Sequence, residues 1–199
     1  PSLAQVKEDE MVAFCDIVLE RAEEAQEQYG TADSQVFSDY KEMLAAMDLD
    51  VVHVCTPNVS HAEISIAALE AGNHVMCEKP MAKTTAEARE MIEVAKRTGK
   101  KLTIGYQNRF ATESRYLQEV CAAGELGEIY SAKAHAIRRR AVPTWGVFLD
   151  EEAQGGGPLI DIGTHALDLT LWMMDNYKPK YVVRKTYQKL AKTENAANA

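Results

Sequence analysis

The sequence predicts a doubly wound α/β fold followed by the opening of a second, α+β domain. Short apolar runs without polar alternation, typical of parallel strands covered on both faces, alternate with stretches of helical periodicity. Strands and helices in this alternation form right-handed crossover units, and therefore a parallel sheet. The alternation stops after Gly124, so we expect one domain over residues 1–123 and another over 124–199.

The expected elements of the first domain follow from this pattern. The expected strands are residues 11–16, 51–56, 74–80 and 101–107. The expected helices are residues 19–29, 61–71 and 84–97. A glycine follows each helix, as is common at helix C-termini. Thr84 is a natural N-cap, with Glu87 near the position that completes a capping box.

The pattern changes beyond Gly124. The sequence predicts one longer alternating strand over residues 128–140, then a loop with Trp145, then a helix over about residues 158–174. This is how an α+β domain would open. The tail at 189–199 loses its apolar pattern, and we expect it to fray or to be a cut end.

Composition and charge narrow the classes of partner. The 199 residues are 46% hydrophobic and 26% charged, as in ordinary globular proteins, and the net charge is -8. An acidic chain is not expected to bind nucleic acid, because phosphates need a basic face. No apolar run approaches the roughly 20 residues of a membrane helix, so we expect no membrane span.

The cysteines indicate a cellular compartment. Cys15, Cys55, Cys77 and Cys121 are widely spaced, and three of them lie in apolar strand-like runs, where a thiol behaves as a small hydrophobic group. This spacing is not that of a zinc site. We therefore expect reduced cysteines in a cytoplasmic protein, with no metal and no disulfide.

The candidate functional residues lie at the C-terminal ends of the expected strands, where ligands bind in open α/β sheets. Asp16 ends the first expected strand, at the place where dinucleotide-binding folds use an acid to accept hydrogen bonds from the ribose. An acid there disfavours a 2′-phosphate, which favours NAD over NADP. By spacing alone, Asp16 is explained better as a helix-capping or turn aspartate.

A polar turn follows the next strand and contains Thr56, Pro57, Asn58 and His61. These residues can line a cofactor, or they can simply cap the helix that His61 opens. The residues alone leave both explanations open.

A charged pair, Glu78 and Lys79, ends the strand before Pro80. A lysine at the sheet edge over a ligand crevice can exchange a proton with a substrate hydroxyl. The alternative is a surface ion pair before a turn, and a motif this short does not decide between them.

The stretch over residues 155–169 is the most informative, because three glycines precede an apolar segment with acids and a histidine. If Pro158 lies in the first helical turn, Asp161 and His165 share one helical face, where a carboxylate can orient an imidazole. Such a histidine suits proton abstraction from an alcohol at neutral pH. The alternative is a helix capped by Asp161 with His165 in the core. Asp168 could share the same face.

Trp145 is a candidate lid or sugar-stacking residue, although packing in the core is the more common fate of a tryptophan. The arginines at 138–140 alternate across their expected strand, so only part of this run could point inward. Neither feature decides a function by itself.

Taken together and in order, these motifs resemble the Gfo/Idh/MocA family of oxidoreductases. The resemblance covers about residues 11–175 and depends on E-K-P with a downstream D-x-x-x-H behind G-G-G. It implies an NAD(P)-binding Rossmann domain followed by an open-sheet substrate domain, in a homodimer or homotetramer. It also implies hydride transfer between a hydroxyl of a sugar, inositol or related polyol and the nicotinamide.

The resemblance assigns a role to each matched residue. His165 would remove the hydroxyl proton, Lys79 would steady the developing alkoxide, and Asp161 would hold the tautomer of His165. Gln107 and Arg109 would lie near the nicotinamide. The full set of expected cofactor-binding residues is Asp16, Thr56, Pro57, Asn58, His61, Glu78, Lys79, Gln107, Arg109 and Trp145.

Two parts of the family pattern are not found in this sequence. The first strand with its G-x-G-x-x-G turn should lie just upstream of Pro1, and most of the substrate-domain sheet should follow residue 186. In the dinucleotide fold the first strand lies between 11–16 and 51–56, so its loss would leave backbone groups unpaired. We therefore expect the sequence to be part of a longer chain or a defective fragment.

Two other functions remain open. A glycoside hydrolase resembling the same family would keep NAD bound and use transient oxidation to break a glycosidic bond. A dinucleotide-responsive sensor would bind the cofactor without turnover. Loss of the lysine or the histidine would be the usual mark of a sensor, and Lys79 and His165 are both present.

Overall fold

The computed structural model describes residues 5–6, 8–137, 142–187 and 189 of the chain. The first part is a parallel pair of strands, β1 (Ala13–Cys15) and β2 (Gln35–Phe37). α1 (Leu19–Tyr29) makes the crossover between them, and α2 (Tyr40–Ala46) leads away from β2. The expected first strand and first helix are confirmed by this unit.

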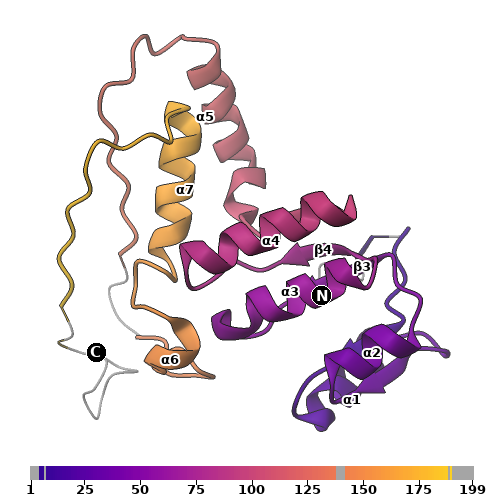
Figure 1. The fold of residues 1–199 in the computed structure, drawn as a ribbon. Coiled ribbons are helices and arrows are strands. Elements are labelled where there is room, and N and C mark those ends of the chain that lie inside the picture. Colours follow the sequence, from indigo (N-terminus) through magenta and orange to yellow (C-terminus); the bar gives the residue numbers. More distant parts are fainter. Residues whose placement is uncertain (1–4, 7, 138–141, 188, 190–199) are drawn as a thin grey trace.

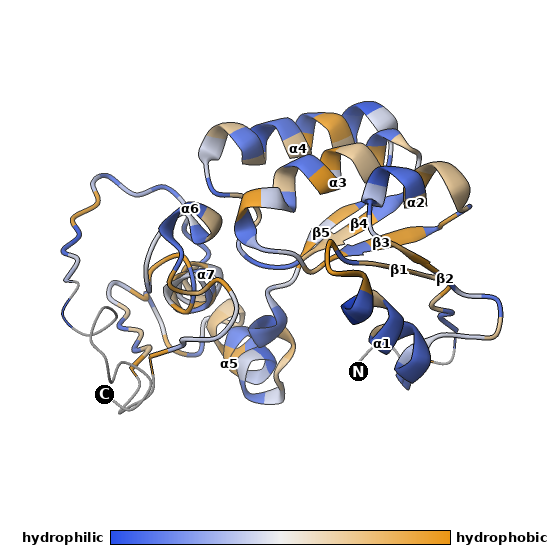
Figure 2. Cartoon of the chain, turned by 90° about the horizontal axis from the view of Figure 1, so that it is seen from below, coloured by the Kyte–Doolittle hydropathy of each residue, from blue (hydrophilic) through white to orange (hydrophobic). Residues whose placement is uncertain are grey.

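A second parallel sheet has the strand order β3 (Val51–Val54), β4 (His74–Cys77), β5 (Leu102–Ile104). The connecting helices are α3 (His61–Glu70) and α4 (Thr85–Thr98), and both cover the same side of the sheet (Figure 1). Figure 2 shows α1 on the opposite side. The parallel α/β fold predicted from the sequence is therefore confirmed.

The core lies between the second sheet and its two helices. Val54 and Val75 from the strands meet Leu69 from α3 and Met91 from α4, and each of these side chains is at most 2% exposed. Burial of one such side chain contributes roughly 1.5–3 kcal/mol to stability. This packing fixes the points at which β3 and β4 end. It therefore also fixes the positions of the polar residues that follow these strands.

The N-terminus of α4 has the predicted capping box. The hydroxyl of Thr84 accepts a hydrogen bond from the backbone N–H of Glu87 at 3.2 Å, and the carboxylate of Glu87 accepts from the N–H of Thr84 at 2.9 Å. The helix ends at Gly99, whose φ of 68° lies in the left-handed region that favours glycine. Both ends of α4 are thus set by local sequence.

The sequence analysis missed β2 and α2. β2 spans only Gln35–Phe37, too short to give a periodic signal, and its backbone groups are paired because β1 lies beside it. α2 did have a local signal, since the carboxylate of Asp39 accepts a hydrogen bond from the N–H of Lys41 at 2.8 Å.

The chain leaves the second sheet through the short 3-10 helix η3 (Gln107–Phe110) and enters α5 (Thr112–Ala122). α5 packs against α7 (Gly163–Met174) instead of the sheet (Figure 1). The short helix α6 (Glu151–Gln154) lies against the turn that follows β3. The domain boundary near residue 124 stays a prediction.

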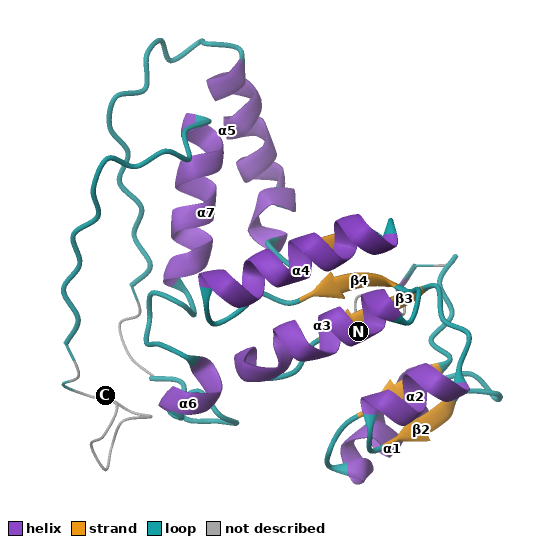
Figure 3. Cartoon of the chain, viewed as in Figure 1, coloured by secondary structure: helices purple, strands orange, loops and turns teal. Residues whose placement is uncertain are grey.

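The predicted strand over residues 128–140 is wrong for its described part, because residues 128–137 form a loop (Figure 3). An extended segment becomes a strand only when a neighbour pairs with its backbone groups. None of the backbone hydrogen bonds described in the structure joins residues 128–137 to another segment. Residues 138–140, with the arginine run, lie outside the described residues.

The predicted helix over residues 158–174 begins later than expected. The carbonyl of Gly157 accepts from the N–H of Ile160 at 3.0 Å, and the carbonyl of Pro158 accepts from the N–H of Gly163 at 2.7 Å. These turns occupy the segment before α7, so Pro158 is not in its first turn and Asp161 precedes the helix. The prediction that Asp161 and His165 share one helical face is therefore wrong.

Among the described residues, no helix combines the length and the apolar character that a bilayer crossing requires.

Candidate active site

The site lies at the edge where the strands of the second sheet end. The N–H of Glu78 donates to the carbonyl of Val54 at 2.9 Å, and the N–H of Gly105 donates to the carbonyl of Cys77 at 2.8 Å. These bonds continue the hydrogen-bond pattern of the sheet beyond the ends of the strands. They hold Glu78 and Gly105 side by side. A Cβ atom at Gly105 would lie 3.2 Å from a carboxylate oxygen of Glu78, so the absence of a side chain leaves room for that carboxylate.

Lys79 is held by a residue far away in the sequence. Its Nζ lies 2.9 Å from Oδ1 of Asp161 and also donates to the backbone carbonyl of Asp161 at 3.2 Å. The two side chains are 18% and 27% exposed, so the ion pair is partly shielded from water. The amine is thereby aimed by a carboxylate, and Asp161 orients Lys79 where the sequence had predicted that it orients His165.

His165 is buried next to this pair. It is 7% exposed, and its Nδ1 has no hydrogen-bond partner among the residues that the structure describes. Burial lowers the pKa of the imidazole, and the charge of Lys79 lowers it further, against the opposing effect of Asp161, Glu78 and Asp168. The imidazole is therefore neutral at pH 7 and can accept a proton.

The Nδ1 atom of His165 is available for a further hydrogen bond. A buried polar atom without a partner costs about 1–3 kcal/mol, so a ligand hydroxyl that reached Nδ1 would recover a hydrogen bond. Lys79, Asp161 and His165 thus converge at one edge, as a base and an amine that handle an alcohol must do. The charge of Lys79 acts on the imidazole of His165, and the convergence of these two residues on one substrate stays a prediction.

A second group of contacts, which sequence reasoning did not find, holds the start of α7. The hydroxyl of Tyr106 lies 3.0 Å from the hydroxyl of Thr164, and the Tyr106 ring packs edge-on against His165, with ring centroids 6.1 Å apart. Arg109 pairs with Asp168 and lies over the ring of Trp172. In the sequence, the position of Tyr106 next to the polar residues 107–109 is the one feature that could have indicated these contacts.

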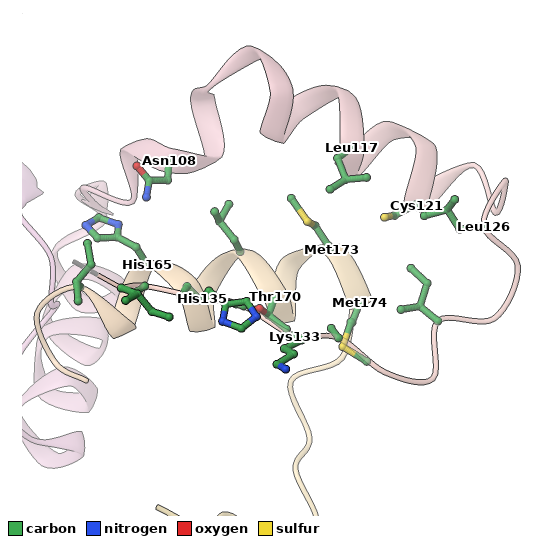
Figure 4. A pocket seen from close by; sticks show the side chains of 18 residues that line it. Asn108, Leu117, Cys121, Leu126, Lys133, His135, His165, Thr170, Met173 and Met174 are labelled. Atoms are coloured by element: carbon green, nitrogen blue, oxygen red, sulfur yellow. Dashed lines mark hydrogen bonds between the residues drawn. The ribbon is translucent and has the colours of Figure 1, made fainter. Parts of the chain in front are cut away.

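A pocket of about 610 Å³ lies between α5, α7 and residues 126–137 (Figure 4). His165 and Asn108 lie at one end of it, and Leu117 and Met173 line its middle. Lys133 contributes an amine from the loop across the pocket. The pocket combines an apolar wall with a polar end at the candidate base, which is the usual form of a small-molecule site.

Asp16 follows β1, at the end of the first sheet, and is partly exposed. Its carboxylate accepts a hydrogen bond from the N–H of Val18 at 2.9 Å, so it has the turn-capping contact that its spacing predicts. A carboxylate has further lone pairs, and this contact does not prevent Asp16 from accepting hydrogen bonds from a ribose.

The structure corrects the expected role of His61. This side chain is 1% exposed, with Nδ1 2.7 Å from the carbonyl of Pro80 and Nε2 2.8 Å from the carbonyl of Thr56. Both ring nitrogens are occupied, so His61 offers no free nitrogen to a cofactor. It ties the turn after β3 to Pro80, which follows Lys79 in the turn after β4.

The other turn residues differ in their access to a ligand. The amide nitrogen of Asn58 donates to the carbonyl of Gln154 at 2.9 Å, which ties the turn to α6. Pro57 is exposed, and Thr56 is partly exposed and accepts a hydrogen bond from the hydroxyl of Ser60 at 2.8 Å. This turn can therefore present Thr56 and Pro57 to a ligand while Asn58 anchors it.

Two further residues that were expected to bind the cofactor, Gln107 and Trp145, do not lie in the cluster of Lys79 and His165. Gln107 is exposed at the start of η3. Trp145 is 59% exposed and packs edge-on against Phe148, with ring centroids 5.5 Å apart. Trp145 is thus neither a core residue nor a residue that stacks on this site in the structure.

The glycines before α7 make a close approach possible. Gly155 has a φ of 74°, and a Cβ there would lie 2.8 Å from the side chain of Lys83. Lys83 donates from Nζ to the carbonyl of Glu152 and so holds α6 beside the turn after β4. The neighbour that approaches Gly155 is therefore this lysine.

Two family models match the chain. The model described as "Oxidoreductase family, NAD-binding Rossmann fold" matches residues 1–106, and the model described as "GFO/IDH/MocA C-terminal domain" matches residues 114–199.

Among curated relatives, the chain is similar to D-glucoside 3-dehydrogenase of Escherichia coli K12, with 48% identity over 181 residues. The match covers 91% of this chain and 51% of the relative. The chain is also similar to the crystal structure of myo-inositol 2-dehydrogenase from Lactobacillus plantarum, with a TM-score of 0.75 and 25% identity over 87% of this chain and 51% of that one.

A third similar structure is levoglucosan dehydrogenase in complex with NADH and levoglucosan. Its TM-score is 0.69 and its identity 29%, over 82% of this chain and 44% of that one. The chain thus spans about half the length of the curated relatives it matches.

Proposed function

The chain belongs to the Gfo/Idh/MocA family of oxidoreductases, and we propose that it acts as an NAD-dependent dehydrogenase that oxidises a hydroxyl group of a sugar or polyol. The observation that carries this proposal is the cluster of Lys79, Asp161 and His165 at the carboxyl edge of the second sheet. Ligands bind at this edge in open α/β folds.

The protein's own residues would move the proton. The pKa of His165 is lowered and its Nδ1 has no partner among the described residues, so the imidazole would accept the proton of the substrate hydroxyl. The ammonium group of Lys79 steadies the charge that develops on the oxygen, and Asp161 holds that amine in place. The nicotinamide, when bound, supplies the acceptor for the hydride.

The residues at the sheet edges fit a dinucleotide. Asp16 would accept hydrogen bonds from the ribose, and Thr56, Pro57 and Glu78 would lie along the cofactor between β1 and the nicotinamide end. We propose NAD as the preferred cofactor, because the charge of Asp16 repels a 2′-phosphate. An Asp16→Ser variant should therefore lose part of its preference for NAD over NADP, measured as the ratio of kcat/KM values.

We propose a D-glucoside as the first substrate to test, with inositols second. The support is the name of the E. coli relative, at 48% identity. The polar end of the pocket, with His165 and Asn108, would face the hydroxyl that reacts, and the apolar wall would face the rest of the ligand.

The test is the growth of NADH absorbance with methyl glucosides, myo-inositol and levoglucosan. His165→Ala and Lys79→Ala should each lower kcat by roughly 100-fold or more, since each removes a group that acts in proton transfer or charge stabilisation. Arg97→Gln, at an exposed ion pair with Glu70, is the control and should keep full activity.

Three outcomes would overturn the proposal. Sugar release from a glycoside without net NADH indicates a glycoside hydrolase. NAD binding without turnover on any of these compounds indicates a sensor. Full activity in His165→Ala would remove the base from the mechanism.

We also propose a homodimer or homotetramer in the cytoplasm. The support for the compartment is that Cys15, Cys55, Cys77 and Cys121 are all free thiols. The support for the assembly is the family alone. Light scattering on the purified protein would measure its mass in solution.

A further inference from the structure

Arg109 and Asp168 form a two-point ion pair between η3 and α7. Nε of Arg109 donates to Oδ2 of Asp168 at 2.7 Å, and Nη2 donates to Oδ1. The side chain of Asp168 is only 11% exposed and that of Arg109 is 32% exposed. A planar guanidinium on both oxygens of a carboxylate fixes orientation as well as distance.

Aromatic rings hold the guanidinium in place. Its Cζ lies 5.3 Å from the centroid of the Trp172 ring and 6.0 Å from that of Tyr106. Tyr106 in turn contacts Thr164 and the ring of His165. Tyr106 and Arg109 therefore contact α7 at two places. One is Thr164, the residue before His165, and the other is Trp172, one turn beyond Asp168.

Asp168 also acts on His165 through its charge. The two residues are three apart on α7, so their side chains lie on neighbouring positions of one helical face. The Asp168 carboxylate favours the protonated imidazole, as do Asp161 and Glu78, while Lys79 opposes protonation. Lys133 and His135, from the loop over residues 126–137, line the same pocket as His165.

Arg109 is the cation that compensates Asp168. Without it, a largely buried carboxylate would lie next to His165 with no partner, and its full charge would draw a proton onto the imidazole. A protonated imidazole cannot accept the proton of an alcohol.

We propose that Arg109 is a positioning residue for the active site: by anchoring and neutralising Asp168, it fixes the turn of α7 that carries His165 and keeps the imidazole an uncharged base. This inference rests on the proposed dehydrogenase function. It assigns Arg109 a role other than the expected one in cofactor binding, because Nε and Nη2 of the guanidinium donate to Asp168.

The direct test is an NMR titration of the His165 ring, assigned from the signal that His165→Gln removes. Arg109→Gln should raise the titration midpoint by about half a pH unit or more, and Asp168→Asn should lower it. Arg109→Lys keeps the charge and should restore most of the wild-type midpoint. Arg97→Gln breaks an exposed pair of the same kind, with Glu70, and should leave the midpoint unchanged.

Steady-state kinetics add a second reading. In Arg109→Gln the acid limb of kcat/KM should move to higher pH, and the loss of the anchor on α7 should lower kcat about 10-fold even above that limb, with the KM for NAD unchanged. A raised KM for NAD with an unmoved His165 titration would show that Arg109 binds the cofactor and would overturn the proposal. Should Arg109→Gln not fold, the double variant Arg109→Gln/Asp168→Asn, which removes both charges, decides the question. Its midpoint should be close to that of the wild type, and a midpoint as low as in Asp168→Asn alone would refute the role of Arg109.

The two proposals fail in different ways. An unmoved titration in an active enzyme refutes the role of Arg109 alone. A moved titration in a protein that oxidises no sugar refutes the dehydrogenase function and leaves the effect of Arg109 on His165 standing.

Discussion

The ammonium group of Lys79 lies 2.9 Å from the carboxylate of Asp161, across 82 residues of sequence. Lys79 belongs to the turn after β4 and Asp161 to the turn before α7, so this ion pair joins the sheet edge to the helix of His165. The carboxylate thereby holds the amine at the start of the segment that leads into α7. The relationship differs from the one predicted from spacing, in which Asp161 served His165 directly.

Removing the charge of Asp161 should misplace Lys79. Asp161→Asn keeps the size of the side chain but weakens the bond to the amine, and we expect kcat to fall by roughly 10- to 100-fold, since small displacements of catalytic groups have effects of this size. Glu70→Gln, which breaks an exposed pair with Arg97, is the matched control and should change kcat by less than about twofold. Equal activity in the two variants would show that the ion pair has no role in catalysis.

The pH dependence should reflect the lowered pKa of His165. Because burial and the charge of Lys79 hold this pKa below the usual value of about 6.5, the acid limb of kcat/KM should have its midpoint below that value. An acid limb above the usual value of a histidine would contradict the assignment of His165 as the base.

The same pKa makes a prediction for stability. The folded protein binds the proton less tightly than the unfolded chain, so this contribution to stability is present above the unfolded pKa and is lost as the pH falls through the folded one. Urea unfolding at a series of pH values should show this loss in the wild type. The loss should be smaller in His165→Gln, which has no group to titrate.

Gly105 should not tolerate a side chain. A Cβ there would lie 3.2 to 3.4 Å from the carboxylate of Glu78, which would have to move away from the sheet edge. We expect Gly105→Ala to lower kcat/KM and to destabilise the protein by about 1 kcal/mol. If the carboxylate causes this loss, Gly105→Ala should cost less in a Glu78→Ala background, and an unchanged cost in the double variant would refute the clash.

His61 should be a structural residue. His61→Ala leaves a cavity and removes the partner of two buried carbonyl groups, at Thr56 and Pro80, so we expect a loss of about 2–4 kcal/mol in the free energy of unfolding. His53→Ala, at an exposed position on β3, should change it by less than about 0.5 kcal/mol. A His61 variant of full stability with weakened NAD binding would restore the cofactor-binding role.

Features that depend on neighbours along the chain could be predicted from the sequence. The capping box of Thr84 and Glu87 and the glycine after α4 are local, and they formed as expected. The apolar runs at β3 and β4 were expected to be parallel strands, and they are, although only one face of β3 is buried. The residues at the ends of these strands were therefore found in sequence.

Features that depend on distant partners could not be predicted. β2 is a strand because β1 lies beside it, and residues 128–137 form no strand because none of the described segments pairs with them. The start of α7 at Gly163 depends on turns around Pro158, which a helical pattern does not reveal. His61 and Arg109 were expected to meet the cofactor, and their actual partners are distant in sequence.

The sequence by itself determined the parallel α/β fold of the first part and the family, and it supplied a lysine and a histidine as candidates for proton transfer. Only the tertiary structure decided which carboxylate serves which of them: Asp161 holds Lys79, and Asp168 is taken by Arg109. Fold class follows from hydrophobic periodicity, which the sequence displays directly. Ion pairing and burial depend on distances between residues far apart in the chain, and these exist only after the chain has packed.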